Sequence, residues 1–543
     1  MNIKLKKGIT YAIIVTAFSM MGVSRESESS YPIRVSNEKK NEERSEEVMA
    51  FRGNSGMKIS NFNACDEANI NRFGMEFFVQ KSGQDRPNID FYTGETYASL
   101  PGVTCFRGNN MRDTASYGTV TVNEEKLNIL WQKNIGGMGE WTGVGWNGQP
   151  AIVKWNSFVI KDMNIKNEKK NKDGLKEVIY ATLDGNVYFL DLEDGKETRS
   201  KLTIGAPIKG SVSVDPRGIP ILYVGQGIEN NNVSFAYRIF SLVDFSKLYE
   251  FRGHDSFARR DWGAFDSTAL IDGSNDSIYL CGENGIFYSG KLNTTYVKGK
   301  VAVSPQIDKY RYDFNNKNRR GMENSIAIYN NYGFFADNDG MLQCLNLKTL
   351  KPVWSVNVND DTDSTVVLDK KGNELSLFTA CEIDFQGNDG YSYTRKIDGA
   401  TGRILWENKY KCAFDDHTNG GALATPIAGK NDISNLVIYN IARTPSYNEG
   451  ILIALDKESG REVWKLRLKN YCWSSPVALY TKEGKSYIVQ CDSTGKAMLI
   501  EGTTGKMLHN IDLGSNVEGS PAAFNNTLVV GTRGGKIIGF EVK

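Results

Sequence analysis

A short motif occurs eight times along this chain and constrains the fold more than any other feature of the sequence. Each copy, here called an anchor motif, has a polar residue, a spacer that is often Pro or Thr, and then an apolar run. Successive spacers lie 39 to 62 residues apart, an interval typical of β-propeller blades whose loops vary in length. Eight copies therefore predict eight blades. The copies are Gln149-Pro150-Ala151, Ser211-Val212-Ser213, Ser267-Thr268-Ala269, Ser325-Ile326-Ala327, Ser364-Thr365-Val366, Thr425-Pro426-Ile427, Ser475-Pro476-Val477 and Ser520-Pro521-Ala522.

The sixth repeat shows the expected make-up of one blade. It contains four short segments rich in β-branched and aromatic residues, at 424–428, 436–440, 451–455 and 462–468. Gly, Asn, Asp or Lys residues bound each segment, as they bound strands that are joined by tight turns. The pattern predicts four-stranded blades and an all-β fold.

The third and fourth strands are joined by a turn of fixed spacing. An acidic residue is followed by Gly four residues later and by Trp four residues after that, as in Asp456, Gly460 and Trp464. The Gly allows a positive backbone angle, and the Trp offers a large apolar surface to cover the seam between blades. His509 occupies this Trp position in the seventh repeat, so we expect it to pack at a seam.

The eighth repeat ends before its outer strand. A candidate for that strand precedes the first anchor motif, because Asn123 lies eight residues before Trp131, the offset that separates Asp398 from Trp406. We therefore expect 130–133 to pair with the C-terminal strand and to close the ring. Closure removes the open sheet edges that a linear array would expose. The predicted fold is an eight-bladed β-propeller closed by an N-terminal strand.

The first hundred residues differ from the repeats. Residues 1–24 contain three lysines and then an apolar run of about 15 residues, which is typical of a signal peptide or an N-terminal anchor. Residues 25–48 are charged and lack apolar periodicity, so they predict a disordered linker. Residues 49–104 suggest no fold, and 105–543 form the predicted propeller. We expect an exported protein, extracellular or associated with the cell envelope, that meets a membrane only through its N-terminal segment.

The eight cysteines of an exported chain raise the question of disulfides. Cys281 and Cys491 align with a column of small residues that precedes the turns between strands, so they are expected to be free structural thiols. Cys65 and Cys105 are the best candidates for a pair if any disulfide forms. The aligned column contains Ala181, Gly225, Cys281, Ala336, Cys491 and Gly531.

The repeat also resembles a known superfamily. The turn from Asp398 to Trp406, its copy from Asp456 to Trp464 and the Ser/Thr-Pro strand starts resemble quinoprotein-like β-propellers. That superfamily includes quinone-dependent alcohol dehydrogenases and the propeller lipoprotein of the outer-membrane β-barrel assembly machinery. More narrowly, 102–110, 141–146, 471–476 and 529–534 look like exported, largely uncharacterised bacterial proteins labelled pyrroloquinoline-quinone-binding-like.

The resemblance implies cofactor chemistry only if the matching residues are present. A quinone-dependent dehydrogenase of this type would have a disulfide between adjacent cysteines, a Ca²⁺ held by acidic and amide side chains, and an Asp base. No two cysteines are adjacent in this chain, and no Glu, Asn and Asp set is recognisable from a local motif. We therefore expect no cofactor, and a quinone-dependent oxidoreductase with an altered pocket is the alternative.

Other catalytic and binding classes find little support. The chain has three histidines, which leaves few ways to build a His-based metal site or a Ser-His-Asp relay. Asn357, Asn359, Asp361 and Asp363 alternate as oxygen ligands of Ca²⁺ would, but their loop lacks the Gly and Glu of a helix-flanked calcium loop. It is expected to be a solvated turn, and no metal site is predicted. A net charge of +1 disfavours nucleic acid as a partner.

Any ligand is expected near the axis of the ring. The connections that precede the anchor motifs gather there on one face, which we call the axial face. Aromatic side chains beside polar groups suit a sugar or a peptide, whereas the alternative is that the Trp residues simply fill the central channel. The candidate ligand-binding residues are Trp141, Trp146, Lys209, Arg260, Asp261, Trp262, Glu323, His417, Trp473 and Glu518.

The sequence favours a non-catalytic binding or scaffold propeller at the cell envelope. Its partner is an unknown protein, peptide or glycan. A carbohydrate-binding surface protein that uses the Trp-rich face is a further alternative. The repeated residues build the ring, so any function must come from residues that do not repeat.

Overall fold

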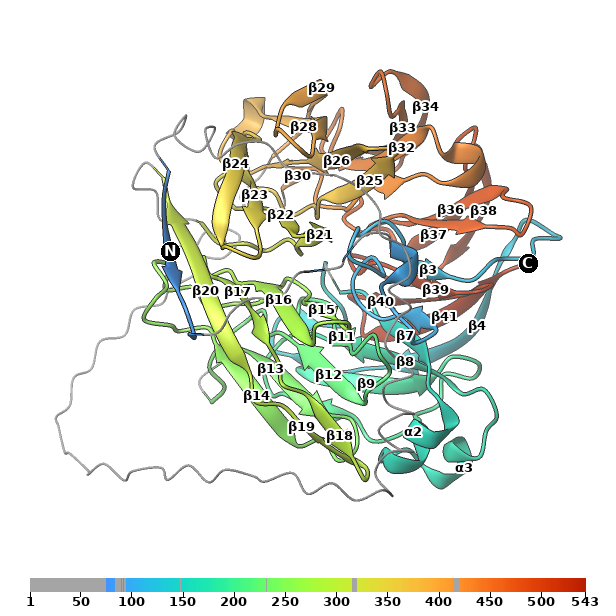
Figure 1. The fold of residues 1–543 in the computed structure, drawn as a ribbon. Helices are drawn as coiled ribbons and strands as arrows, with labels where there is room; N and C mark the ends of the chain where they lie inside the picture. The colour runs from blue at the N-terminus through green and yellow to red at the C-terminus, as the bar shows by residue number, and fades with distance from the viewer. Residues whose placement is uncertain are drawn as a thin grey trace.

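Eight β-sheets are arranged in a ring around a central axis in the computed structural model (Figure 1). The structure describes residues 75–83, 89, 91, 94–146, 148–230, 232–314, 320–414 and 419–543. The predicted all-β fold with eight blades is confirmed. The predictions for residues 1–24 and 25–48, for Cys65 and for His417 lie outside the described residues.

Each blade contains four main strands, and the anchor motifs lead into the innermost ones. The inner strands are β7 (Ala151–Lys154), β11 (Ser213–Val214), β15 (Leu270–Asp272), β21 (Ala327–Tyr329), β25 (Val367–Lys371), β31 (Ile427–Ala428), β35 (Val477–Tyr480) and β39 (Ala522–Phe524). The second strands are β8 (Lys176–Ala181), β12 (Ile221–Val224), β16 (Ser277–Cys281), β22 (Tyr332–Ala336), β26 (Glu374–Ala380), β32 (Leu436–Ala442), β36 (Ser486–Cys491) and β40 (Thr527–Thr532). The third strands are β9 (Asn186–Asp191), β13 (Ala236–Ser241), β17 (Phe287–Lys291), β23 (Met341–Asn346), β28 (Tyr391–Asp398), β33 (Gly450–Asp456), β37 (Lys496–Glu501) and β41 (Lys536–Val542). The outer strands are β10 (Leu202–Thr203), β14 (Lys247–Arg252), β20 (Gln306–Asp313), β24 (Lys351–Asn357), β29 (Ile404–Lys411), β34 (Glu462–Leu468), β38 (Met507–Asp512) and β4 (Leu127–Asn134).

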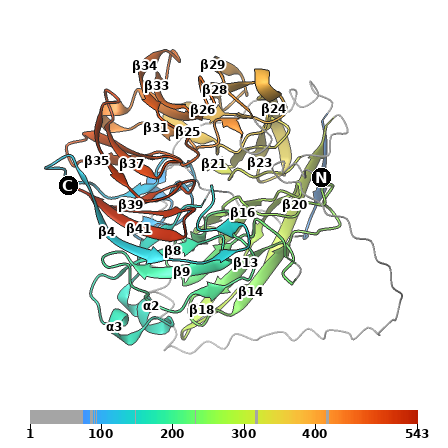
Figure 2. The same cartoon turned by 180° about the vertical axis from the view of Figure 1, so that it is seen from behind.

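The eighth blade joins segments from both parts of the chain. Strand β4 pairs antiparallel with β41, from Leu127 opposite Val542 to Asn134 opposite Lys536, and it is the outer strand that the offset of Trp131 predicts. Figures 1 and 2 show β4 beside the C-terminal strands. The short strand β3 (Ser116–Tyr117) pairs parallel with β39 on the inner side of the same blade. The last blade is therefore held from both edges by N-terminal segments.

The described part of 49–104, for which the sequence suggested no fold, extends two other blades. Strand β1 (Glu76–Gln80) pairs with β20 and adds a fifth strand to the third blade. Strand β2 (Gly102–Val103) pairs with β7 in the first blade. The remaining elements are β5 (Gly137–Met138), β6 (Trp141–Thr142), α2 (Ser157–Asp162), α3 (Asn167–Lys170), β18 (Thr295–Val297), β19 (Lys300–Ala302), β27 (Glu382–Ile383), β30 (Gly420–Gly421) and the 3-10 turns η3 (Gly94–Thr96), η4 (Gly387–Asp389) and η5 (Asn431–Ile433). Within the described residues, no helix is both long and apolar enough to cross a bilayer.

The apolar core is divided among the seams between blades. Eight clusters of buried side chains each join two neighbouring blades. Trp354 illustrates the predicted seam contact, because its ring covers Gly402 in the next blade and its Nε1 donates to the carbonyl of Gly399 at 3.0 Å. Gly402 has a φ of 71°, as the turn requires. His509 also reaches the next blade, where its Nδ1 accepts the backbone N–H of Leu127 at 3.2 Å.

The anchor motifs repeat because their hydroxyl groups link the blades. Ser475 Oγ accepts the backbone N–H of Thr425 at 3.0 Å, and Ser520 Oγ accepts that of Ser475 at 3.0 Å. The same bond joins Thr425 to Thr365, and the carbonyl of Gly148 accepts the N–H of Ser520, so the last blade is tied to the first. A hydroxyl at this position satisfies a buried backbone donor that would otherwise lose its hydrogen bond.

The cysteines of the described residues are all free and buried. Cys281 and Cys491 lie in the predicted column of small residues. Space is tight there, since a Cβ on Gly225 would lie 2.1 Å from the carbonyl oxygen of Phe265. Cys105, named above as half of the best candidate pair if any disulfide formed, is one of the free thiols.

Candidate functional site

The two ends of the ring axis are built from different parts of the blades. Each inner strand starts at its anchor motif and runs along the axis, so residues that precede the anchor motifs gather at the axial face. Residues that follow the inner strands gather at the opposite end. There the backbone N–H groups of Leu100 and Val120 donate to the carbonyls of Pro216, which follows inner strand β11, and of Tyr480, the last residue of inner strand β35.

An N-terminal segment, residues 103–116, closes the end opposite the axial face. We call it the plug. Arg107 Nη1 donates to the carbonyl of Pro476 at 2.7 Å and its Nη2 donates to that of Pro426 at 3.0 Å. The side chain of Arg107 is buried, and burial lowers its pKa to about 10. Arg107 thereby binds the spacer residues of the anchor motifs of the sixth and seventh blades.

A second buried arginine makes the matching contacts on the other side of the axis. Arg112 Nε donates to the carbonyl of Ile326 at 2.8 Å, and its Nη2 donates to that of Thr268 at 2.9 Å. Its Nη1 also donates to the carbonyl of Phe106 within the plug at 2.7 Å. The rigid fork of the guanidinium group suits several acceptors at once. The two arginines together bind four anchor motifs.

Backbone groups of the plug form hydrogen bonds with the other four blades. The backbone N–H groups of Val214, Leu368 and Ala523 donate to plug carbonyls at 2.9 to 3.0 Å, and Gln149 exchanges hydrogen bonds with the plug backbone. The plug therefore contacts all eight blades. It contains no Trp, so this end is not filled by the tryptophans that the sequence suggested as a plug.

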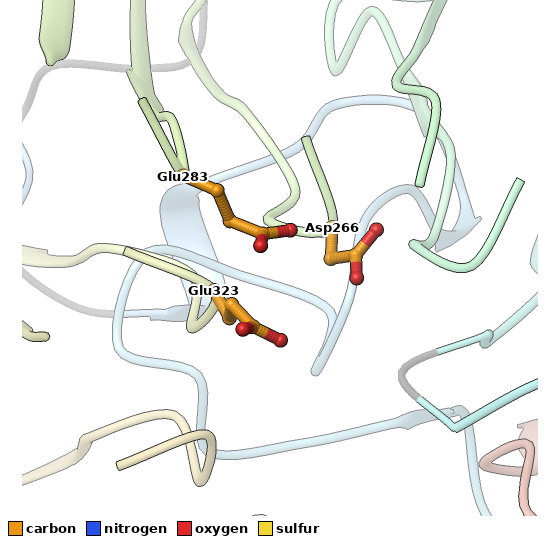
Figure 3. Close-up of side chains that lie close together, drawn as sticks. All are labelled: Asp266, Glu283 and Glu323. Carbon is orange, nitrogen blue, oxygen red and sulfur yellow. The ribbon is translucent and has the colours of Figure 1, made fainter. Parts of the chain in front are cut away.

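The axial face has a different character, because several buried carboxylates meet there. Asp266, Glu283 and Glu323 are at most 3% exposed and point toward one another (Figure 3). One oxygen from each lies within 4.8 Å of the others. Glu323, Asp361 and Asp363 form a second group with the same spacing. We call these five residues the acidic cluster.

Position along the blades explains why these side chains meet. Asp266, Glu323 and Asp363 precede the anchor motifs of the third, fourth and fifth blades, where the connections enter the inner strands. Glu283 follows β16, in the turn that leads to β17 at the same end of the third blade. The sequence identified Glu323 by this position. It missed Asp266, although this residue directly precedes the anchor motif of the third blade, and it missed Glu283, because turns between the second and third strands were not considered.

Hydrogen bonds fix the acidic cluster from its edges. Trp262 Nε1 donates to Glu283 Oε2 at 2.7 Å. Asn338 Nδ2 donates to Glu323 Oε1 at 2.7 Å and lies 3.4 Å from Asp361 Oδ2. Lys209 Nζ lies 3.3 Å from Asp266 Oδ2. Three of the predicted residues, Lys209, Trp262 and Glu323, thus contact or belong to the cluster.

The protonation equilibria reflect the crowding of negative charge. Burial raises the pKa of Glu283 well above its ordinary value, and the charges of Glu323 and Asp266 raise it further. Burial acts to lower the pKa of Lys209, but the neighbouring charges of Asp266, Glu283 and Glu323 raise it above its ordinary value. The cluster therefore favours any added positive charge.

The other predicted residues lie around the axial face without joining the cluster. The Arg260 guanidinium packs on the backbone of Gly321, and its charge acts on Glu283. Asp261 is exposed, Trp141 lies in the β5–β6 hairpin, and Trp146 is buried before the first blade. Glu518 accepts from Arg533 Nη1 at 3.1 Å. Trp473 packs against Tyr471, with ring centroids 5.4 Å apart.

Residues 357–363 were expected to form a solvated turn, but in the structure only the first part of this segment is exposed and the second part is buried. Asn357 and Asn359 are exposed, and the side chain of Asn359 accepts from Arg395. Asp361 and Asp363 are buried in the acidic cluster. The alternating ligand pattern that the sequence showed is therefore not one site, although its second half faces the axis.

Comparisons with known proteins agree with the β-propeller fold. A family model described as outer membrane protein assembly factor BamB matches residues 448–543. The quinoprotein ethanol dehydrogenase of Pseudomonas aeruginosa is 26% identical over 165 residues, which cover 30% of this chain. The chain spans only 22% of the length of that curated relative.

Solved structures extend the similarity to most of the ring. The quinohemoprotein alcohol dehydrogenase of Comamonas testosteroni aligns over 81% of this chain and 80% of its own, with 11% identity and a TM-score of 0.57. The quinohemoprotein alcohol dehydrogenase ADHIIG of Pseudomonas putida HK5 aligns with the same coverage, 12% identity and a TM-score of 0.54. The chain therefore has a β-propeller fold similar to that of these dehydrogenases. This agrees with the resemblance noted in its repeats.

The described axial face meets only part of what a quinone-dependent dehydrogenase would be expected to have. Buried carboxylates lie beside the amide of Asn338, as in the expected set of acidic and amide side chains. The described cysteines are free, so they provide no disulfide to pack on a cofactor.

Proposed function

We propose that this quinoprotein-like propeller is a non-catalytic binding or scaffold protein at the cell envelope, and that its axial face holds a protein partner. Two features support the location and role. The family model that matches 448–543 describes an outer membrane assembly factor, and the N-terminal sequence is typical of export. The partner is a protein rather than a glycan because of the side chains described next.

The observation that carries the proposal is a stack of aromatic and arginine side chains on the axial face. Tyr447 is 45% exposed, and the Arg443 guanidinium lies 3.8 Å from the centroid of its ring. The same guanidinium lies 5.1 Å from the ring of Tyr471, which packs on Trp473. Tyr, Trp and Arg dominate the energetic centres of protein interfaces. Because Arg443 is buried, it holds the exposed ring of Tyr447 in place before a partner binds.

A catalytic role has less support from the described residues. His254 is exposed and pairs with Glu229 at 3.0 Å, and His509 packs at a seam between blades. Burial raises the pKa of the Cys281 and Cys491 thiols, which opposes formation of a nucleophilic thiolate. These residues do not form a nucleophile and base pair of the kind used in acyl transfer.

Site-specific cross-linking in the native host tests the proposal. A photoreactive amino acid at Tyr447 should give one discrete cross-linked protein species. The matched control is Leu405, which is 42% exposed but lies on outer strand β29 away from the axial face. Equal products from both positions, or cross-linked glycan in place of protein, would contradict the proposed partner.

Thermal unfolding separates this proposal from the oxidoreductase alternative. A cofactor present at 100 times its dissociation constant stabilises the folded state by about 2.7 kcal/mol. Saturating pyrroloquinoline quinone should leave the melting temperature unchanged relative to the same buffer without quinone. A clear rise would restore the oxidoreductase alternative.

A further inference from the structure

We propose that Arg311, at the outer edge of the third blade, binds a side-chain carboxylate in an acidic segment of a protein partner. Strand β1 is the outermost strand of this blade and pairs with β20, which carries Arg311. Figure 1 shows both strands at the periphery of the ring. The site is separate from Tyr447 in the sixth blade, and it rests on the proposed function only in that the carboxylate belongs to a protein.

Two aromatic rings from different elements pack against the Arg311 guanidinium. Phe78 of β1 lies opposite Arg311 in the strand register, and the guanidinium carbon lies 4.6 Å from the centroid of its ring. The ring of Phe257, in the connection between β14 and β15, lies 5.0 Å from the same carbon. Contacts between a guanidinium and aromatic rings are favourable and strengthen when water is excluded. The guanidinium is therefore held in place before a ligand binds.

Arg311 has no counter-ion among the described residues. The residue is half-buried, and its Nε is a buried donor without a hydrogen-bond partner. Its two Nη groups also form no hydrogen bond within the described part of the chain, but they are not buried, so a ligand can reach them from solvent. A donor that lacks a partner where water is excluded raises the free energy, and an acceptor supplied by a ligand removes that penalty.

The charged residues beside Arg311 are already paired with other groups. Lys309 Nζ lies 2.6 Å from Asp255 Oδ2, and Asp313 Oδ2 lies 2.9 Å from Arg259 Nη2. Lys309, Arg311 and Asp313 share one face of β20, because side chains two residues apart on a strand point the same way. Both carboxylates of this neighbourhood therefore have their own cation. Arg311, between them, is left with positive charge for a ligand.

The chemistry of the guanidinium selects the ligand. Its planar fork of N–H donors matches the two oxygens of a carboxylate, and the same flat group packs on aromatic faces. The rings of Phe78 and Phe257 exclude water from part of it, which strengthens a charge-assisted hydrogen bond at its free edge. An Asp or Glu side chain of a partner offers such a carboxylate, and the residues beside it can contact the two rings.

Fluorescence anisotropy with the purified full chain and labelled peptides tests the site. Amidated hexaglutamate should bind, and amidated hexaglutamine, which has the same length and no side-chain charge, should bind at least about tenfold more weakly. Arg311→Gln should weaken hexaglutamate binding by about tenfold or more, because it removes the charged fork. Arg252→Gln is the matched control and should bind as the wild type does, since Arg252 lies on outer strand β14 and its side chain is 82% exposed.

A conservative variant separates the planar fork from positive charge alone. Arg311→Lys keeps the charge but loses the fork, so it should bind hexaglutamate several-fold more weakly than the wild type. If Arg311→Gln does not fold by circular dichroism, Phe257→Leu replaces it. That variant removes one of the two rings, and a several-fold loss of hexaglutamate binding is expected.

The outcomes that overturn the site are distinct. They are equal binding of hexaglutamate and hexaglutamine by the wild type, and undiminished hexaglutamate binding by Arg311→Gln or Arg311→Lys. Hexaglutamine with a free C-terminal carboxylate that binds as tightly as amidated hexaglutamate would overturn the acidic segment as the ligand. None of these results alters the cross-link expected at Tyr447, so failure of this site and failure of the proposed function are distinguishable.

Discussion

Both ends of the propeller axis contain buried charged side chains, but the plug buries arginines that are hydrogen-bonded to carbonyls, whereas the axial face buries carboxylates close to one another. In the plug, Arg107 and Arg112 donate to carbonyls of four blades, and each positive group meets several acceptors. In the acidic cluster, five buried carboxylates lie close together, with Lys209 beside Asp266 and the charge of Arg260 acting on Glu283. The first arrangement stabilises the ring, whereas the second costs stability in the absence of a ligand. Natural sequences retain such local costs chiefly at functional sites. The difference supports a structural role for the plug and is one reason why we propose the axial face as the functional surface.

The largest loss of stability is expected from removing strand β4, which closes the ring. Deletion of residues 120–135 removes β4 and exposes the edge of β41. We expect loss of cooperative unfolding, measured by calorimetry. A truncated protein with an unchanged melting transition would show that closure by β4 does not stabilise the ring as described.

A point substitution in the plug is expected to have the next largest effect. Arg112→Met keeps much of the side-chain volume but leaves the carbonyls of Ile326, Thr268 and Phe106 without their donors. Denaturant unfolding should show a loss of about 3 to 5 kcal/mol. The control is Arg252→Met, whose side chain is 82% exposed and should change stability by less than about 0.5 kcal/mol. Equal effects at both sites would contradict the structural role of the plug.

A substitution in the ring of anchor motifs should have a moderate effect. Ser475→Ala removes the oxygen that accepts the N–H of Thr425 and leaves a buried donor unsatisfied. The expected loss is about 1 to 2 kcal/mol in the free energy of unfolding. No measurable loss would show that the hydroxyl groups are not the reason for the repeated motif.

The smallest predicted effect is a gain in stability. Glu323→Gln removes one negative charge from the acidic cluster, and the amide oxygen can still accept from Asn338. In EDTA the variant should be more stable than the wild type by about 1 kcal/mol, because it removes a like charge from a buried, crowded site. A destabilised variant would mean that the carboxylates are satisfied without a ligand, and the contrast between the two ends would fail.

The sequence predicted the ring better than its two ends, for a physical reason. Anchor motifs and seam tryptophans recur because every blade needs the same hydrogen bond and the same apolar cover, so repetition exposes them. Trp131 could be placed by its offset alone. Arg107 and Arg112 bind backbone carbonyls, which any residue supplies, so their partners leave no pattern in the sequence.

The candidate site was predictable only in part. Lys209 and Glu323 were found because they precede anchor motifs, and position in a blade determines which end a residue faces. Glu283 and Asn338 come from turns between the second and third strands and occur once each, so no repetition marks them. Their convergence depends on the packing of neighbouring blades, which a single sequence does not specify.

Photo-cross-linking from the two ends of the axis tests the functional assignment of the axial face most directly. A photoreactive amino acid at Tyr447 on the axial face should give one discrete cross-linked protein species in the native host. The same amino acid at Tyr117, which is 38% exposed in β3 beside the plug, should give none. Equal products from both positions, or a product from Tyr117 alone, would contradict the assignment.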